Sequence, residues 1–221
     1  MKRLLLLTYI VFITTLGFAQ NKSYTIKGKI FGIDLNGESI DMVELGDGYN
    51  NAIQNTRVRN NEFIFTGTVD KPTLWMLLIE QHKILFVAEN ANIAVEIYPD
   101  SSRVSGTKIN EDFQEFVDKS NAYRKQITEQ YTRYQATPED SPEKSLLLKQ
   151  FDEMEKHWHT QVIVKFIEAN INNPAGQRAF KSLLPDLSID ELKSIIANID
   201  SVNIQTPLIQ QGIERINTPK E

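Results

Sequence analysis

The sequence contains no cysteine among its 221 residues. This absence excludes thiol catalysis, thiolate metal sites and disulfide exchange, because each of them requires a cysteine sulfur. It does not argue against export, since a chain of this length can bury enough apolar surface to fold without disulfides. Thiol chemistry by this chain alone is therefore ruled out.

Basic residues are outnumbered. The chain has 24 Lys and Arg against 29 Asp and Glu, a net charge of −5. Proteins that bind nucleic acids usually carry clustered Lys and Arg that neutralise phosphates. We therefore expect no nucleic-acid partner.

Catalytic and nucleotide-binding motifs are missing as well. The sequence has no G-x-S-x-G nucleophile elbow, no S-x-x-K with its companion motifs, and no G-x-G-x-x-G or Walker loop. Adjacent carboxylates fall at predicted helix starts or on exposed helical positions, where they are typical of dipole partners rather than of a glycosidase site. These carboxylates are Glu139/Asp140, Asp152/Glu153 and Asp190/Glu191. We expect no catalytic residue and no cofactor; a hydrolase whose site only the fold assembles is the alternative.

Only one long apolar run is present, at the N-terminus. Two basic residues precede the apolar stretch Leu4–Leu16, and the small residues Gly17 and Ala19 precede Gln20. This pattern predicts a secretory signal over residues 1–19. The run is shorter than the about 20 residues of a membrane span, and no second run exists, so we expect no integral span after cleavage. An uncleaved N-terminal anchor is the alternative, and the lack of cysteine excludes a lipoprotein.

The next segment has the two-residue period of β-strands. Removing residues 1–19 leaves 202 residues, and the alternation begins at Tyr24 and continues to Ser105. The segments TLWMLLIE, ILFVA and IAVEIY are more uniformly apolar, as expected of strands buried on both faces. Short strands at roughly ten-residue spacing are typical of an antiparallel sandwich or barrel. We predict about 7–8 strands in a β-sandwich module over residues 20–106.

After Gly106 the period of the apolar residues changes to roughly 3.6. One apolar and aromatic stripe runs from Phe113 to Tyr134, and a second runs from Leu147 to Ala169. They predict two helices of about 25 residues that form a long antiparallel hairpin. The proline-rich segment between them offers two successive cap-then-proline starts, Thr137–Pro138 and Ser141–Pro142.

Three shorter helices are predicted in the rest of the chain. They start at Asn173, at Ser188 with Glu191 closing a capping box, and at Thr206. Residues 107–221 are therefore expected to be helical. The whole chain belongs to the α+β class, with an N-terminal sandwich or barrel followed by the hairpin and the short helices.

The stretch EKHWHT, residues 155–160, holds two of the three histidines. Residues two apart in a helix differ by about 200°, so His157 and His159 should point away from each other. A helical metal pair needs a spacing of three or four, and the third histidine, His82, lies in a strand turn. We expect no metal site, and predict that the two histidines are solvated flanks of a buried Trp158.

Tyrosines of the first long helix are the candidates for a partner contact. Tyr123, Tyr131 and Tyr134 lie on its aromatic stripe, which could dock a partner protein. The alternative is that the stripe forms the seam of the hairpin or its contact with the sheet. The loop GDGYNN, residues 46–51, lacks the regular acidic positions of a calcium loop and predicts only a turn.

The order of several motifs resembles a known family, the domain of unknown function 4369. The motifs are YTIKGKIFGI, RVRNNEFIFTGTVDKPT, ILFVAENANIAVEI and RVSGTKINEDFQEF, followed by FIEANINNPAGQRAFKSLL in the helical part. Ala91 replaces a glycine that is usual in this family. The resemblance implies an N-terminal module of exported thioredoxin-like thiol–disulfide reductases. The C-x-x-C of the thioredoxin-like domain has no counterpart here, so no catalytic residue can be carried over.

These observations together predict a non-catalytic module for protein–protein contact in the periplasm or outer envelope. Its partner would be an envelope protein. The alternative is an accessory subunit of a thiol–disulfide oxidoreductase system, with a separate thioredoxin-like protein as its partner. The surplus of apolar positions on the long hairpin also predicts a homodimer.

Overall fold

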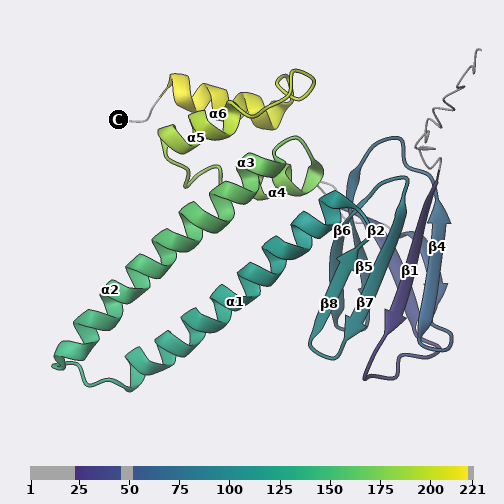
Figure 1. Cartoon of the computed structure of the whole chain (residues 1–221), viewed down its shortest axis with the longest axis horizontal. Helices are drawn as coiled ribbons and strands as arrows, with labels where there is room; N and C mark the ends of the chain where they lie inside the picture. Colours follow the sequence, from purple (N-terminus) through teal and green to yellow (C-terminus); the bar gives the residue numbers. More distant parts are fainter. Residues whose placement is uncertain (1–22, 46–51, 219–221) are drawn as a thin grey trace, which may run out of the picture.

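The computed structural model describes residues 23–45 and 52–218, and strands precede helices along the chain (Figure 1). The predicted signal and the predicted turn at residues 46–51 lie outside the described residues. The strands are β1 (Tyr24–Ile30), β2 (Ser39–Glu44), β3 (Ala52–Arg57), β4 (Glu62–Gly67), β5 (Thr73–Ile79), β6 (His82–Ala88), β7 (Asn92–Tyr98) and β8 (Ser101–Ser105). The helices are α1 (Lys108–Ala136), α2 (Pro142–His157), the π-helix η1 (Trp158–Val164), α3 (Lys165–Asn170), α4 (Pro174–Leu183), α5 (Ile189–Ile196) and α6 (Pro207–Asn217). The predicted α+β class is confirmed.

The eight strands form two four-stranded sheets, so the alternative of a closed barrel is settled in favour of a sandwich. The strand orders are β4-β1-β7-β8 and β3-β2-β5-β6. All neighbouring strands are antiparallel except β1 and β7, which run parallel. The prediction of an entirely antiparallel sandwich is wrong for this pair, because side-chain alternation is the same for both strand directions.

The sandwich core lies between the two sheets and follows the predicted alternation. In β1, Tyr24, Ile26 and Ile30 are buried, while the lysines between them are exposed. The core holds 18 buried residues, with Phe86, Ile40 and Leu77 fully enclosed. Burial of this much apolar surface makes the sandwich a cohesive unit without any disulfide.

Burial on both faces is confirmed for β5 and for the last three residues of β6, but not for the first half of β6, where Leu85 is exposed, nor for β7. Adjacent residues in each of the first two strands are buried, as in Leu74 with Trp75 and Phe86 with Val87. Leu74 and Val87 lie on the outer face, where they pack with Phe166 and other apolar residues of the helical region. β7 alternates between buried and more exposed residues, so only one of its faces lies in the core.

Helix α1 seals one open side of the sandwich. Its buried residue Asn110 accepts a hydrogen bond from the Val87 N–H (2.8 Å) and donates one to the Val87 carbonyl (2.9 Å). One turn later, Gln114 accepts from the Val104 N–H of β8 (2.8 Å). Two side-chain amides therefore take the place of a neighbouring strand on the edges of both sheets.

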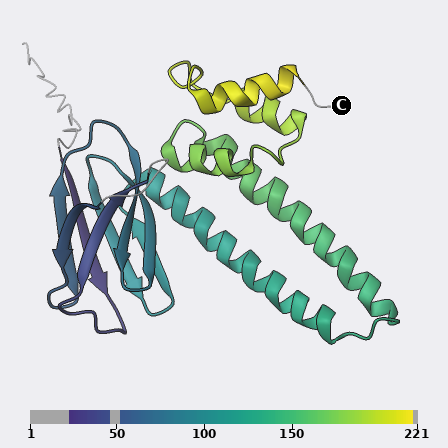
Figure 2. The ribbon, with the colours of Figure 1, turned by 180° about the vertical axis from the view of Figure 1, so that it is seen from behind.

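The predicted long hairpin is present and extends away from the sandwich in both views (Figure 2). α1 has 29 residues, and α2, η1 and α3 follow one another without a break. Of the two predicted helix starts between the long helices, Ser141 is the one that caps a helix, by accepting a hydrogen bond from the Glu143 N–H (3.2 Å). The predicted start at Thr137 is wrong, because that residue instead ends α1 with its N–H bonded to the Tyr134 carbonyl.

The three short helices begin at the predicted residues and pack into a second core. Asn173 caps α4 by accepting from the N–H groups of Ala175 and Gly176, and Ser188 and Glu191 form the predicted capping box of α5. α6 begins after Thr206, without a side-chain cap. Eight buried residues hold these helices against η1 and α3, namely Val164, Ile167, Ile171, Phe180, Leu187, Leu192, Ile195 and Ile209.

No helix in residues 23–45 and 52–218 is long and apolar enough to cross a membrane.

Candidate functional site

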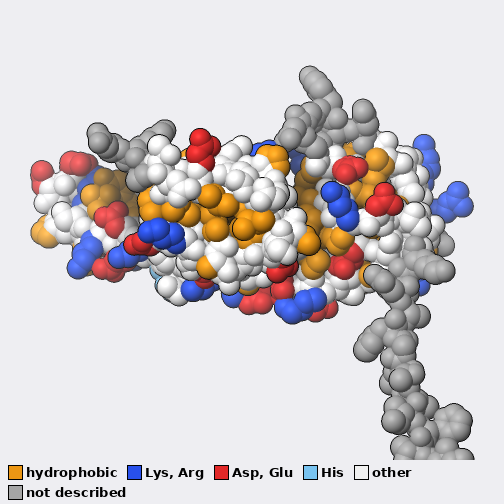
Figure 3. Space-filling view, turned by 90° about the horizontal axis from the view of Figure 1, so that it is seen from above, with side chains coloured by type: hydrophobic (Ala, Val, Ile, Leu, Met, Phe, Trp, Pro, Cys, Tyr) orange, Lys and Arg blue, Asp and Glu red, His pale blue; other side chains and the backbone are white. Residues whose placement is uncertain are grey.

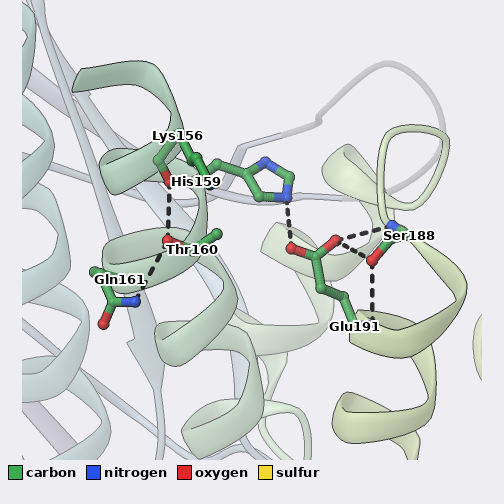
Figure 4. A network of polar contacts seen from close by, with 6 residues as sticks. All are labelled: Lys156, His159, Thr160, Gln161, Ser188 and Glu191. Atoms are coloured by element: carbon green, nitrogen blue, oxygen red, sulfur yellow. Dashed lines mark hydrogen bonds and ion pairs between the residues drawn. The ribbon is translucent and has the colours of Figure 1, made fainter. Parts of the chain in front are cut away.

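The two neighbouring histidines have different environments. His157 is exposed, as predicted, but His159 is half-buried and its Nε2 lies 3.0 Å from the Glu191 Oε1 on α5. Figure 4 shows the imidazole of His159 directed from η1 toward this carboxylate. The prediction that both histidines are solvated is therefore wrong for His159. The partner is 32 positions away along the chain, so helical spacing could not reveal it.

Glu191 receives three hydrogen bonds at once. Its Oε2 accepts from the Ser188 N–H (2.8 Å) and the Ser188 hydroxyl (2.7 Å), while Oε1 faces His159 (Figure 4). Burial acts to raise the pKa of this carboxyl. The hydrogen bonds from Ser188 and the contact with His159 outweigh that effect, so the pKa lies below its usual value. Glu191 is therefore held as a carboxylate.

This network does not have the arrangement of a catalytic triad. In a triad the histidine lies between the hydroxyl and the carboxylate and takes the proton of the hydroxyl. Here Glu191 lies between Ser188 and His159, and the Ser188 hydroxyl donates to Glu191 instead. The network is suited to joining α5 to the long helix. Within the described part of the chain, no three His, Asp or Glu side chains form a group that could hold a metal ion.

The remaining carboxylate pairs are on the surface. Glu139 forms an ion pair with Lys144, and Glu153 lies 3.8 Å from Lys149 in the next turn of α2. Asp152 and Asp190 are exposed.

The three predicted contact tyrosines are separated by the fold. Tyr123 stacks on Trp158 across the hairpin, with ring centroids 4.8 Å apart and planes within 7°. Tyr134 packs edge-on against Phe151 at 6.2 Å. These two rings form the seam of the hairpin, which was the alternative interpretation of the stripe. Tyr131 is 52% exposed and remains the accessible member of the set.

The π-helix η1 was not predicted by any pattern in the sequence. It spans seven residues from Trp158 to Val164 and lies where the hairpin meets the C-terminal helices (Figure 1). Trp158 stacks between Tyr123 and Phe116, and the next residue, His159, reaches Glu191. A π-turn holds more residues per turn than an α-turn, which changes the direction of the side chains that follow. η1 thus directs two adjacent side chains to two different helices, Trp158 to α1 and His159 to α5.

A groove of about 730 Å³ lies between the two halves of the molecule and is here called the junction groove. Its walls come from the end of β2, the start of β5, the starts of α1 and α4, and the loop between α5 and α6. Apolar side chains of both halves line it, including Leu45 and Leu74 from the sandwich and Val202 and Leu208 from the C-terminal part. Charged residues at the same groove are Glu44, Lys71, Arg178, Lys181 and Asp200.

Val202 is the most conspicuous residue of the junction groove. Its side chain is 81% exposed, and Ile204 in the same loop is 36% exposed. Hydrophobic side chains also gather on the face over α5 and α6 (Figure 3). No motif in the sequence predicts this site; the one local signal is that Val202 and Ile204 alternate with polar residues in a loop, which is an unusual position for two large apolar side chains.

Residues 24–113 match the family described as "Domain of unknown function (DUF4369)". The match confirms the predicted resemblance for all eight strands and the first turns of α1, including Asn110. A search of the curated proteins and a search of the solved structures found no match. The helical wall of the junction groove lies beyond the matched residues.

Proposed function

We propose, taking residues 24–113 as a DUF4369 domain, that the chain is a non-catalytic envelope module that binds a partner protein through the junction groove. The observation that carries this proposal is Val202, a large apolar side chain that is 81% exposed beside a groove lined by both halves. Protein interfaces characteristically combine an apolar centre with a polar rim. Leu45 and Leu208 supply further apolar surface, and Lys71 and Asp200 supply charges around it.

The chemistry of the polar clusters supports a binding role over a catalytic one. Glu191 accepts two hydrogen bonds from Ser188 and contacts His159, and this engagement favours a structural role for the carboxylate. The absence of cysteine removes thiol chemistry from the whole sequence. Export to the periplasm or outer envelope is part of the same proposal and rests on the signal-like residues 1–19.

Site-specific photo-crosslinking tests the groove in the intact chain. A photoreactive side chain at position 202 should give a discrete crosslinked product in envelope material, and excess unmodified protein should compete it away. The matched control places the same group at Lys125, an exposed residue of α1 far along the hairpin. A Val202→Asp protein should compete poorly. Identical products from both positions, or no product from position 202, would contradict the proposal.

A second candidate is an accessory role in a thiol–disulfide system. Residues 24–113 match the family, and the resemblance to that family implies a module that precedes a thioredoxin-like domain, which supports this candidate. The cysteine-free chain alone should show no insulin reduction. A separate thioredoxin-like protein should bind this chain, and the rate at which the thioredoxin-like protein reduces insulin should change when this chain is added. Turnover by the chain alone would overturn both candidates.

The predicted homodimer stays a prediction. Leu146 and Leu148 on α2 are 56% and 48% exposed, and Tyr131 on α1 is also exposed, so the hairpin does offer apolar surface. Light scattering of the purified chain decides between one copy and two.

A further inference from the structure

The hairpin of β3 and β4 opens after a single pair of residues. Arg59 and Glu62 exchange two backbone hydrogen bonds (2.9 and 3.0 Å) around a two-residue turn at Asn60 and Asn61, both in the left-handed region. Beyond this pair the legs diverge into different sheets, since β3 pairs with β2 and β4 pairs with β1. No ladder joins β3 to β4 within these described strands.

The direction of the backbone groups on β4 follows from this pair. In an antiparallel strand, every second residue turns its N–H and C=O to the same side. Glu62 uses its backbone groups on Arg59, so Ile64 and Thr66 also turn theirs away from β1. The Thr66 carbonyl confirms this direction, because it accepts a hydrogen bond from the side chain of Gln54 on β3 (3.1 Å).

The β3 leg has the complementary direction. Val58 uses its backbone groups on the β2 side, donating to the Glu38 carbonyl and accepting from the Gly37 N–H, both at 3.0 Å. The alternate residues Arg57 and Asn55 therefore turn their backbone groups toward β4. Arg57 and Ile64 would form the next rung if the hairpin continued. Arg57 and Ile64 do not pair, so the backbone N–H and C=O groups of both residues face an opening between β3 and β4.

A cleft of about 780 Å³ occupies this region, here called the hairpin cleft. Lys27 lies directly between Ile64 of β4 and Ala94 of β7, so an exposed apolar residue and a small one flank a cation. Four basic residues line the cleft against two acidic ones, namely Lys27, Lys29, Arg57 and Arg59 against Glu62 and Glu96.

Two of these cations are available to a ligand. Lys29 is 3.6 Å from Glu62, and Arg57 donates to the Gly37 carbonyl (2.7 Å). The side chains of Lys27 and Arg59 have no hydrogen-bond or ion-pair partner among the described residues. A ligand with carboxylates would therefore meet uncompensated positive charge in a chain that is acidic overall.

The hairpin cleft is also the side of the sandwich that α1 leaves uncovered. Asn110 caps the edge of β6 and Gln114 caps the edge of β8, at the opposite side of each sheet. β4 lies at the edge remote from α1 in both ribbon views (Figures 1 and 2). Unpaired strand edges are the places where extended peptides add to sheets.

We propose that the hairpin cleft binds a short, extended, acidic peptide segment of a partner protein. The segment lies as an added strand against the backbone of Ile64 on β4 or of Arg57 on β3, and its carboxylates pair with Lys27 and Arg59. This site is separate from the junction groove, so neither proposal depends on the other.

A defined peptide tests the proposal with the full-length protein. The probe is a fluorescent heptapeptide of alternating Glu and Val, and binding is followed by fluorescence anisotropy. The same peptide with N-methylated backbone nitrogens keeps the charge but cannot donate strand hydrogen bonds, and should bind at least about tenfold more weakly. A Lys–Val heptapeptide should not bind.

Protein variants locate the site. Arg59→Glu and Lys27→Glu should each weaken binding of the Glu–Val peptide by about tenfold or more. The matched control is Lys83→Glu, an exposed lysine of β6 in the other sheet, and should leave binding unchanged. Circular dichroism confirms that each variant is folded, and Arg59→Glu, in the turn region, serves if Lys27→Glu does not fold.

Several outcomes would overturn the proposal. If the N-methylated peptide bound as tightly as the unmethylated one, binding would depend on charge attraction alone and not on strand hydrogen bonds. Failure of the Glu–Val peptide to bind, or an equal loss with Lys83→Glu, would remove the site altogether. A dimer that Arg59→Glu dissociates would assign the edge to a second copy of this chain instead.

Discussion

At the scale of single residues, Glu191 holds together parts of the chain that are far apart in sequence. It closes the capping box of α5 with Ser188 and also receives His159 from η1. A carboxylate at the start of a helix is stabilised by the unpaired N–H groups and by the helix dipole. The same group therefore starts α5 and fixes that helix to the long hairpin.

Replacing Glu191 with Gln should lower the free energy of unfolding by about 1–2 kcal/mol near neutral pH, because hydrogen bonds to a charged acceptor are the stronger ones. The pKa of Glu191 is lowered in the folded state. Its stabilising contribution is therefore complete above the ordinary glutamate pKa of about 4.3 and is lost as the pH falls through the folded value. Urea denaturation at a series of pH values measures both effects.

Asp190→Asn is the matched control for this experiment. Asp190 is an exposed carboxylate in the same first turn of α5, and the change should stay within about 0.5 kcal/mol. A difference between wild type and Glu191→Gln that persists unchanged to about pH 3 would show that the charge of Glu191 is not what stabilises the contact.

At the scale of elements, α1 is part of the sandwich as much as of the hairpin. Asn110 is 1% exposed and satisfies both backbone groups of Val87 on the edge of β6. A helix rather than a strand thus closes this edge, and it does so with one residue whose amide matches the donor and acceptor of a peptide group.

Asn110→Ala should destabilise the protein by about 2–4 kcal/mol, because it leaves two buried backbone groups of Val87 without partners. Asn110→Asp should also destabilise, since a carboxylate cannot donate to the Val87 carbonyl. Asn121→Ala on the exposed face of α1 is the control and should change stability by less than about 0.5 kcal/mol. Urea denaturation provides the comparison; equal effects at both positions would refute the sealing role.

The hairpin is stabilised most strongly near its base. Trp158 stacks on Tyr123 and on Phe116, which in turn stacks on Phe166 at 4.2 Å. Farther from the base, the side-chain oxygens of Gln130 and Gln150 are buried without a hydrogen-bond partner. Unpaired buried polar atoms weaken the outer part of the hairpin relative to its base.

Hydrogen exchange should therefore divide the long helices into two regions. Backbone amides in the outer part, around Gln130 and Gln150, should exchange at least about tenfold faster than those of β1 and β7. Trp158→Ala should extend fast exchange toward the base and lower stability by about 2–4 kcal/mol, without changing exchange in β1. Uniform protection along α1 and α2 would contradict this division.

Elements with a strong local signal were predictable from the sequence. The alternation around Ile26 and the caps at Asn173 and Ser188 depend on neighbours a few positions away, and the structure confirms them. The predicted number of about 7–8 strands is confirmed by the eight strands of the structure, and β8 has the weakest local signal of them, because only Val104 of its five residues is apolar and buried.

Features that depend on distant residues were not predictable. The pairing of His159 with Glu191 and the parallel pairing of β1 with β7 join segments that only the fold brings together. The hairpin cleft likewise exists because β3 and β4 leave one turn for two different sheets. Local periodicity reports only on residues a few positions apart, so it cannot indicate any of these contacts.

At the scale of the whole molecule, two large cores are joined by a small one. The sandwich and the C-terminal helices each have their own buried cluster, and among the described residues the cluster between them has four buried members, Leu74, Val87, Phe166 and Ala175. The sandwich should therefore fold without the C-terminal helices. Folding of the sandwich alone also requires the start of α1, because Asn110 and Gln114, which pair with the edges of β6 and β8, lie beyond the last strand.

Two fragments test this condition. A fragment of residues 20–106 lacks Asn110 and Gln114 and exposes both strand edges, so it should aggregate or unfold at a lower urea concentration. A fragment of residues 20–118 keeps both amides and should be a folded monomer. Size-exclusion chromatography and urea denaturation compare the two, and unpaired edges are the physical cause of the difference.

The control for extra length is the longer fragment carrying Asn110→Ala and Gln114→Ala together. If the amides act as the missing strand neighbours, this variant should behave like the shorter fragment, although it has the same chain length as its parent. If it behaves like its parent, then apolar contacts of Ile109 and Phe113 with the outer face of the sandwich are what stabilise the edge. Equal stability of all three fragments would mean that the sandwich tolerates open edges on both sides, and the hairpin cleft would then lose its distinction as the uncovered side.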